Sequence, residues 1–171
     1  MSEPGLICNF TGDGKGKTSA ALGIVLRALG WEWRVAVLQF MKSDQETGEL
    51  RFFRRHFPNL RIEEFGLGRT VYPGDHAGHA RAGWRVAAEL LKSFDGELLV
   101  LDELNVALAH NFLDAAEVID ALKHRRPELN VVITGRNAPR ELCAVCDLVS
   151  SVEEKKHPFR SGIPARKGLD Y

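Results

Sequence analysis

Short apolar runs alternate along the chain with longer segments in which apolar residues recur at helical spacing. The short runs are rich in Val, Ile, Leu and Phe and predict buried strands; they cover residues 6–10, 34–40, 60–65, 98–101, 130–134 and 148–152. The longer segments predict helices, which cover residues 18–29, 49–56, 75–94, 113–123 and 139–146. Residues 153–171 form a polar, basic tail.

This alternation favours one α/β unit. Apolar strands that are linked by helical crossovers form mostly parallel sheets with helices on both faces. A length of 171 residues suits one domain, and no repeat, linker or low-complexity segment divides the chain. We therefore predict a single domain over residues 1–171 with a three-layer α/β/α architecture and a mostly parallel central sheet.

Charge and cysteine content limit the classes of partner and compartment. Lys plus Arg and Asp plus Glu both number 23, so the net charge is zero and no overall basic field favours nucleic acid. No apolar run reaches the length of about 20 residues that crosses a bilayer, and the first residues do not read as a signal peptide. The three cysteines are too few for a disulfide framework and fit a reducing compartment. We expect a cytoplasmic protein that binds neither nucleic acid nor membranes.

Two of the cysteines, Cys143 and Cys146, are spaced as a C-x-x-C pair. The chain has no second such pair to complete a four-ligand zinc site. We interpret these thiols as packed and inert rather than as metal ligands.

A glycine-rich loop connects the first predicted strand to the first predicted helix. Residues Thr11–Thr18 read Thr-Gly-Asp-Gly-Lys-Gly-Lys-Thr, which is the P-loop pattern with Thr11 in place of its first glycine. The glycines let the backbone curl so that N–H groups face phosphate oxygens, and the helix start adds partial positive charge. We predict that the loop binds ATP through Gly12, Asp13, Gly14, Lys15, Gly16, Lys17 and Thr18.

The last two residues of this loop have separate expected roles. Lys17 reaches the terminal phosphates, and the Thr18 hydroxyl is a ligand of Mg²⁺ or Mn²⁺ beside the phosphate oxygens. A glycine-rich turn without a ligand is the alternative, and the strand-to-helix context argues against it. Together with the parallel-sheet pattern, the loop predicts a P-loop NTPase-like fold.

An acidic pair follows the apolar run over residues 98–101. In P-loop proteins an acidic residue at the end of a neighbouring strand holds the metal, and Asp102 and Glu103 are both candidates here. Adjacent residues of a strand point to opposite faces, so we expect the two carboxylates to do different jobs. The alternative, a solvated pair at a strand end, is less credible beside a phosphate loop.

The chain resembles the P-loop family of ATP:corrinoid adenosyltransferases. The phosphate loop alone would be unspecific, but the resemblance runs in the family's order over nearly the whole chain. The segments that carry it are Thr11–Thr18, Val37–Lys42, Val100–Leu104 and Ile133–Arg136, with Lys156–Phe159 and Gly168–Tyr171 in the tail.

This resemblance implies a reaction. Such enzymes transfer the 5′-deoxyadenosyl group of ATP to the Co(I) centre of a reduced corrinoid, release triphosphate, and serve cobalamin biosynthesis or salvage. It implies catalytic roles for Lys17, Thr18 and Glu103, and a contact of Lys15 with the leaving triphosphate. For Arg136, a triphosphate contact and a surface arginine are equally good interpretations.

The chain departs from the family pattern after the third predicted strand. Many members carry a Gly-Phe-Thr-Trp run there, whose aromatic rings press on the corrinoid. This chain has Gly66-Leu67-Gly68-Arg69-Thr70 instead. The resemblance therefore assigns the corrinoid contacts to Leu67, as an apolar wedge, and to Arg69, which would meet an amide or a phosphate of the substrate.

The resemblance also implies partners. It suggests a homodimer and a flavodoxin-like electron donor that keeps cobalt reduced. Some members have a longer N-terminal extension that covers the active site. This chain begins only a few residues before its first predicted strand, so we expect the basic tail or the bound corrinoid to contribute more to covering the active site.

Two other functions remain open from the sequence. One is a P-loop kinase or NTPase that cleaves ATP between phosphates. The other is a nucleotide-dependent corrinoid carrier without turnover.

Overall fold

The computed structural model describes residues 3–41, 47–68 and 73–171, and these build one six-stranded sheet. Every recorded strand pair is parallel, and the spatial order is β3-β2-β4-β5-β1-β6. The strands are β1 (Ile7–Thr11), β2 (Val35–Gln39), β3 (Arg61–Glu64), β4 (Leu98–Asp102), β5 (Asn130–Thr134) and β6 (Leu148–Ser151).

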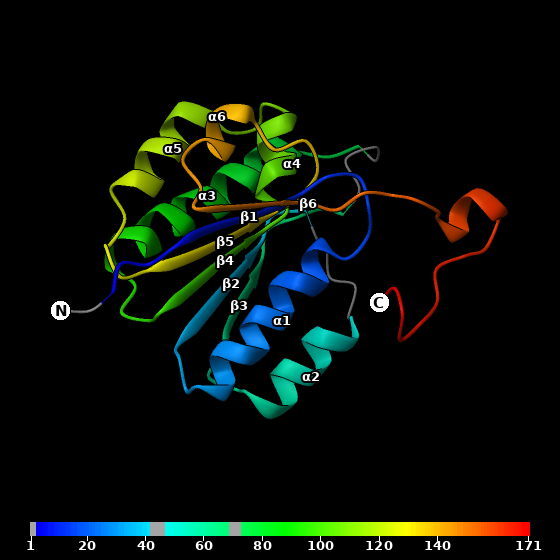
Figure 1. The fold of residues 1–171 in the computed structure, drawn as a ribbon, viewed down its shortest axis with the longest axis horizontal. Helices are drawn as coiled ribbons and strands as arrows, with labels where there is room; N and C mark the ends of the chain where they lie inside the picture. The colour runs from blue at the N-terminus through cyan, green and yellow to red at the C-terminus, as the bar shows by residue number, and fades with distance from the viewer. Residues whose placement is uncertain (1–2, 42–46, 69–72) are drawn as a thin grey trace.

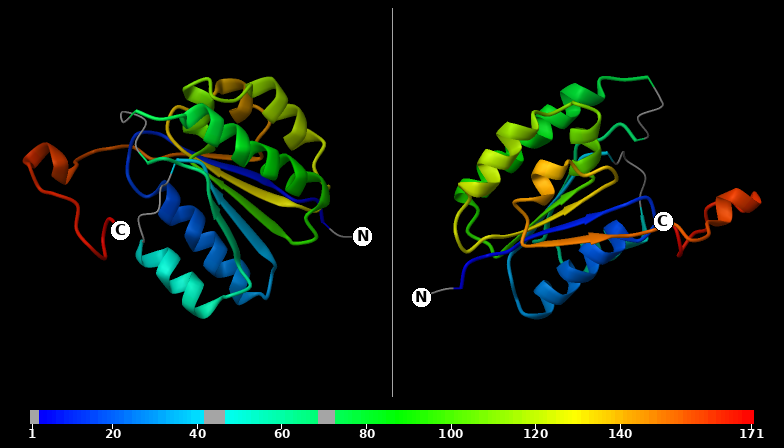
Figure 2. Two further views of the ribbon diagram at one scale, coloured as in Figure 1. Left: turned by 180° about the vertical axis from the view of Figure 1, so that it is seen from behind. Right: turned by 45° about the horizontal axis from the view of Figure 1, so that its top comes forward.

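Helices cover both faces of this sheet, as Figures 1 and 2 show. Two of them, α1 (Lys17–Gly30) and α2 (Gly48–His56), lie on one face. The others lie on the opposite face, namely α3 (His76–Ser93), α4 (Leu104–Ala109), α5 (Ala115–Lys123) and α6 (Arg140–Cys143). A 3₁₀ turn, η1 (Pro158–Ser161), belongs to the tail, which projects away from the layers. The predicted three-layer α/β/α class with a parallel sheet is confirmed.

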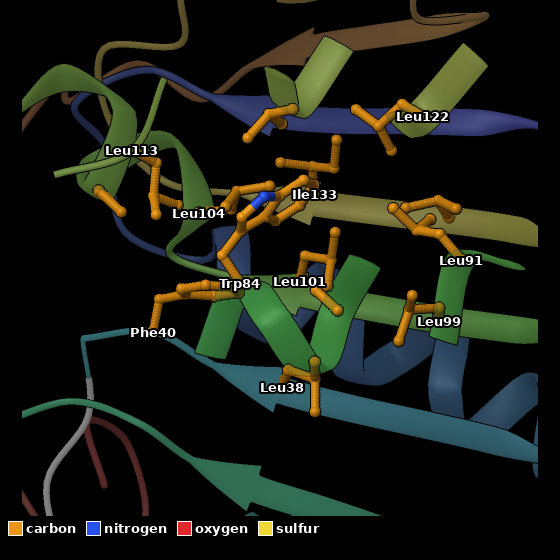
Figure 3. Close-up of a cluster of buried hydrophobic side chains, with 14 of the residues drawn as sticks. Leu38, Phe40, Trp84, Leu91, Leu99, Leu101, Leu104, Leu113, Leu122 and Ile133 are labelled. Carbon is orange, nitrogen blue, oxygen red and sulfur yellow. The ribbon is translucent and has the colours of Figure 1, made fainter. Parts of the chain in front are cut away.

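Apolar side chains separate the layers. The larger cluster joins the inner sheet strands to α3, α4 and α5 and includes Leu101, Leu104, Leu122 and Ile133 (Figure 3). The smaller cluster packs α1 and α2 on the other face. Trp84 lies in the larger cluster, and its indole N–H donates to the Glu117 carboxylate at 2.8 Å. Burial of this apolar surface is the main favourable term that holds the strands in place.

Parallel pairing brings the carboxyl ends of the strands to one edge of the sheet. The register sets Gln39 of β2 beside Asp102 of β4, and Phe10 of β1 beside Thr134 of β5. Loops that leave adjacent strands at this edge are therefore close in space, although they are far apart in the chain. This edge is where the predicted site residues have to meet.

The observed elements follow the hydrophobic pattern closely, with two differences. The helix α4 begins at Leu104, two residues after the end of β4, and has no counterpart among the predicted helices. The helix expected over residues 139–146 is shorter, because α6 covers only Arg140–Cys143. The Asp114 side chain caps α5 by accepting the Ala116 N–H at 2.8 Å. None of the helices described here is long and apolar enough to cross a membrane.

The three thiols are free and partly buried. Burial raises the pKa of the Cys8 and Cys143 thiols. For Cys146, burial and then the nearby Cys143 thiol raise the pKa to about 11, and its S–H donates to the Leu142 carbonyl at 3.2 Å. These properties agree with packed, unreactive thiols.

Alkylation should report this burial. Only the thiolate reacts, so a pKa raised from 9.0 to about 11 lowers the reactive fraction of Cys146 at pH 8. We expect iodoacetamide to label Cys146 about 100-fold more slowly in the native protein than in urea, with the gap narrowing as the pH rises toward 11. Tandem mass spectrometry of the labelled peptide separates the Cys146 signal from that of Cys143. Equal rates at pH 8 in the two states would contradict the assignment.

Candidate nucleotide site

The glycine-rich loop leaves β1 and enters α1, as predicted. Gly12 and Gly16 have φ of 91° and 111°, which residues with a Cβ rarely adopt. A Cβ on Gly12 would also lie 2.5 Å from the Val152 carbonyl oxygen. The loop is therefore shaped by its own backbone and by the chain that leaves β6. No side chain caps the first turn of α1, and this turn holds no acidic residue.

One amide of the loop has a fixed partner. The Gly14 N–H donates to the Val152 carbonyl at 2.8 Å, so it is bound to the tail instead of facing inward. A Cβ on Gly14 would meet Glu153 backbone atoms at 2.8 Å. The root of the tail thus packs against the phosphate loop.

Lys17 lies at the centre of the loop. Its Nζ donates to the carbonyl oxygens of Gly12 and Gly14, both at 2.7 Å, and the residue is only 6% exposed. Burial is the largest influence on its pKa and lowers it, while the Glu103 carboxylate raises it. The Arg136 guanidinium lowers this pKa as well, so an arginine and an acid both lie near the ammonium.

Asp102 accepts hydrogen bonds from three side chains of the site. Its Oδ1 accepts the Thr18 hydroxyl at 2.8 Å and the Thr134 hydroxyl at 2.7 Å, and its Oδ2 accepts Gln39 Nε2 at 2.9 Å. The residue is 1% exposed. Donors from β2, β5 and α1 therefore hold one buried carboxylate, which satisfies a charge that would otherwise be costly to bury. The Oε1 atom of Gln39 is buried and finds no partner among the residues described.

Glu103 leaves the strand in a different conformation. Its φ of 63° lies in the left-handed region, and its N–H donates to the Thr134 hydroxyl at 2.9 Å. The turn starts α4 and keeps the Glu103 carboxylate near Lys17. The two acids differ in conformation and in hydrogen-bond partners, and the reason is this turn rather than simple strand alternation.

A buried amide pair supports the turn from behind. Asn105 Nδ2 donates to Asn9 Oδ1 at 2.7 Å and to the Gly135 carbonyl at 3.1 Å, and both asparagines are fully buried. A Cβ on Gly135 would lie 3.2 Å from Glu103 Oε2. The ends of β1 and β5 and the start of α4 are thereby tied together.

Two basic residues lie at the mouth of the loop. Arg136 Nη2 donates to the Asp13 carbonyl at 2.9 Å, so this arginine touches the loop from the end of β5. Lys15 forms an ion pair with Asp170 of the tail. The sequence left open whether Arg136 contacts the triphosphate or is a surface arginine. Its position against the loop favours the triphosphate contact.

The residues proposed for the corrinoid lie elsewhere. Leu67, 38% exposed, follows β3, and a Cβ on Gly74 would lie 2.7 Å from its Cδ1. Three strands separate β3 from β1 in the sheet. Leu67 therefore lies at the same sheet edge as the phosphate loop but not next to it. Arg69 lies outside the residues that the structure describes.

Several polar residues of the site had no role assigned from sequence. Gln39, Thr134 and Asn9 each stand inside or at the end of an apolar strand, and all are fully buried. A polar residue in such a run is a usable signal, because buried polar groups need partners. Asn105 and Asp170 offered no comparable signal, since their partners come from distant parts of the chain.

Comparison with known proteins gives a consistent result. The sequence model of the family described as "ATP:corrinoid adenosyltransferase BtuR/CobO/CobP" matches residues 3–171. The "Corrinoid adenosyltransferase" of Sinorhizobium sp is 40% identical over 174 residues, which cover 99% of this chain and 81% of that protein. The "Corrinoid adenosyltransferase" of Escherichia coli (strain K12) is 35% identical over 172 residues, which cover 100% of this chain and 88% of that protein.

A solved structure shares the fold at much lower sequence similarity. The crystal structure of the flagellar accessory protein FlaH from Methanocaldococcus jannaschii aligns with a TM-score of 0.58 and 10% identity. The alignment covers 88% of this chain and 72% of that one. At this identity the likeness shows the fold alone.

Proposed function

Because the chain belongs to the ATP:corrinoid adenosyltransferase family, we propose that its phosphate loop and the residues around Asp102 hold ATP for adenosyl transfer. The protein is a transferase that moves the 5′-deoxyadenosyl group of ATP to the cobalt of a reduced corrinoid in cobalamin metabolism. One observation carries the assignment of the site. Lys17, Thr18 and the acidic pair, from separate parts of the chain, converge at one sheet edge.

The chemistry explains what this site has to supply. The Co(I) electron pair attacks C5′ of ATP, the C5′–O bond breaks, and its electron pair leaves on triphosphate. The substrate itself is the nucleophile, so the protein needs neither a nucleophile nor a general base. Its work is to place C5′ against cobalt and to stabilise charge on the leaving group.

Lys17 is proposed as the main stabiliser of the leaving triphosphate. Its ammonium is held at the centre of the loop by two carbonyl oxygens, so little reorganisation is needed when phosphate binds. Partial burial strengthens its interaction with an anion compared with a solvated lysine. Gly12, Asp13, Gly14 and Gly16 supply the backbone around it.

The oxygen groups around Asp102 fit a hard divalent cation, Mg²⁺ or Mn²⁺. The Thr18 hydroxyl, the Asp102 carboxylate and the unpaired Gln39 Oε1 form an oxygen-rich cluster, and Mg²⁺ commonly takes one or two protein oxygens beside phosphates. We propose Thr18 and Asp102 as the metal-holding residues, with Glu103 nearby as a second acidic candidate. When bound, the cation neutralises triphosphate charge.

Glu103, Arg136 and Lys15 are proposed to line the nucleotide. Glu103 is held beside Lys17 by the left-handed turn, which supports a role in orienting the ammonium or the cation. Arg136 touches Asp13 of the loop, and Lys15 is part of the loop itself. Both cations can meet triphosphate oxygens from the solvent side.

The corrinoid is proposed to bind toward β3, with Leu67 as an apolar contact and Arg69 as a polar one. The ends of β1 and β3 are four strand spacings apart, about 19 Å at the usual strand separation. ATP and corrinoid together can span that distance, with the adenosyl group directed along the sheet edge. Leu67 is exposed, which leaves it accessible to a planar substrate.

The remaining assignments concern the whole protein. We propose that residues 1–171 act as one adenosyltransferase domain, because the family match covers residues 3–171 and all six strands within them join one sheet. We also propose a cytoplasmic homodimer that receives electrons from a flavodoxin-like donor, on the basis of family resemblance and the free thiols. Light scattering tests the dimer, and a monomeric mass at micromolar concentration would refute it.

Product analysis separates adenosyl transfer from phosphate cleavage. With ATP, Mg²⁺ and chemically reduced cobalamin, we expect a cobalt–carbon bond, seen in the visible spectrum, and one intact triphosphate for each bond formed. A kinase or NTPase would instead release ADP or phosphate. ADP or phosphate in place of triphosphate, or no cobalt–carbon bond under strong reductant, would overturn the proposal.

Replacing Lys17 tests the leaving-group role. We expect Lys17→Ala to lower the rate of adenosyl transfer by about 10²–10⁴-fold, because a preorganised charge at the leaving group is lost. Lys123→Ala, on the exposed surface of α5, is the matched control and should retain wild-type activity. Activity of Lys17→Ala within twofold of wild type would contradict the role.

A further inference from the structure

The last residues of the chain form a closed turn, here called the C-terminal turn (Arg166–Tyr171). The Asp170 carboxylate accepts the Arg166 N–H through Oδ2 at 2.7 Å, and the Asp170 N–H donates to the Arg166 carbonyl at 2.8 Å. The Gly168 N–H donates to the Tyr171 carbonyl at 2.8 Å. These bonds lie within the turn, so it can move as one unit.

The tail brings this turn back to the phosphate loop. It leaves β6 beside the loop, where Val152 accepts the Gly14 N–H, and then runs outward through η1 before it returns toward the body (Figures 1 and 2). At its tip Asp170 pairs with Lys15. Tyr171 lies next to the start of α2, where a Cβ on Gly48 would be 4.0 Å from its carbonyl carbon. The root and the tip of the tail therefore both contact the phosphate loop.

The contact between Lys15 and Asp170 places an anion on a cation of the triphosphate site. Asp170 Oδ1 forms an ion pair with the Lys15 ammonium, and the Asp170 side chain is only 22% exposed. A triphosphate in the same loop repels this carboxylate and offers Lys15 a stronger anionic partner. The pair and a bound triphosphate therefore oppose each other.

We propose that Asp170 is an intramolecular competitor of triphosphate at Lys15. ATP binding releases the C-terminal turn from the phosphate loop, and the return of the turn to Lys15 favours loss of the triphosphate product. This inference rests on the proposed function, since it takes the loop as the triphosphate site. Lys15 is half-exposed, so the pair lowers nucleotide affinity without blocking the site.

Asp170→Asn separates the charge from the shape of the turn. The asparagine carbonyl can still accept the Arg166 N–H, but the ion pair to Lys15 is lost. We expect Asp170→Asn to bind ATP–Mg²⁺ and inorganic triphosphate about two- to fivefold more tightly by calorimetry, the range for a partly exposed ion pair. Asp120→Asn, an exposed acid on α5, is the charge-matched control and should bind like wild type.

A double variant tests whether the effect passes through Lys15. Lys15→Ala should weaken binding of both ligands, and adding Asp170→Asn should then change nothing further. A gain in affinity from Asp170→Asn that persists without Lys15 would show a general charge effect and overturn the proposed competition.

Hydrogen exchange reports the movement of the turn directly. In the wild-type protein, ATP–Mg²⁺ or triphosphate should speed exchange of the amides of Arg166, Gly168 and Asp170. Slower exchange, or weaker binding by Asp170→Asn, would mean that the turn closes over the nucleotide and would overturn competition. If wild type binds neither ligand, the proposed function fails as well. If it binds both and Asp170→Asn is unchanged, only this inference fails.

Discussion

The site depends on one buried carboxylate. Asp102 at the end of β4 receives hydrogen bonds from Thr18, Thr134 and Gln39, which come from the first turn of α1 and from the strands on either side. A buried charge is stable only when its oxygens are satisfied, so these donors cannot be lost separately without cost. The same bonds set the start of α1 on the sheet, and with it the phosphate loop.

Backbone constraints complete that loop. Gly12 and Gly16 take conformations that favour glycine, and Val152, the residue after β6, packs against the loop. Lys17 is held inside by two carbonyl groups. This preformed loop suits the proposed role of holding a leaving group, in a reaction whose nucleophile belongs to the substrate.

The two ends of the proposed substrate site are built differently. The nucleotide end lies at adjacent strands and is fastened by buried polar pairs such as Asn9 with Asn105. The end that we propose for the corrinoid lies at the edge strand β3, where Leu67 is exposed. The tail contacts the nucleotide end through Asp170 and Lys15. The phosphate loop therefore belongs to the part with buried polar contacts, and the departure from the family's aromatic pattern follows the edge strand β3.

The parallel α/β fold, the phosphate loop and the acidic pair could all be predicted from the chain's residues, because hydrophobic period and glycine spacing are local properties. The sequence also carried the family resemblance. The difference between Asp102 and Glu103 could not be predicted in this way, because the left-handed turn at Glu103 and the donors on Asp102 involve contacts between distant segments. The pairing of Lys15 with Asp170 has the same origin. Such contacts arise from the packing of the whole sheet, which no local pattern encodes.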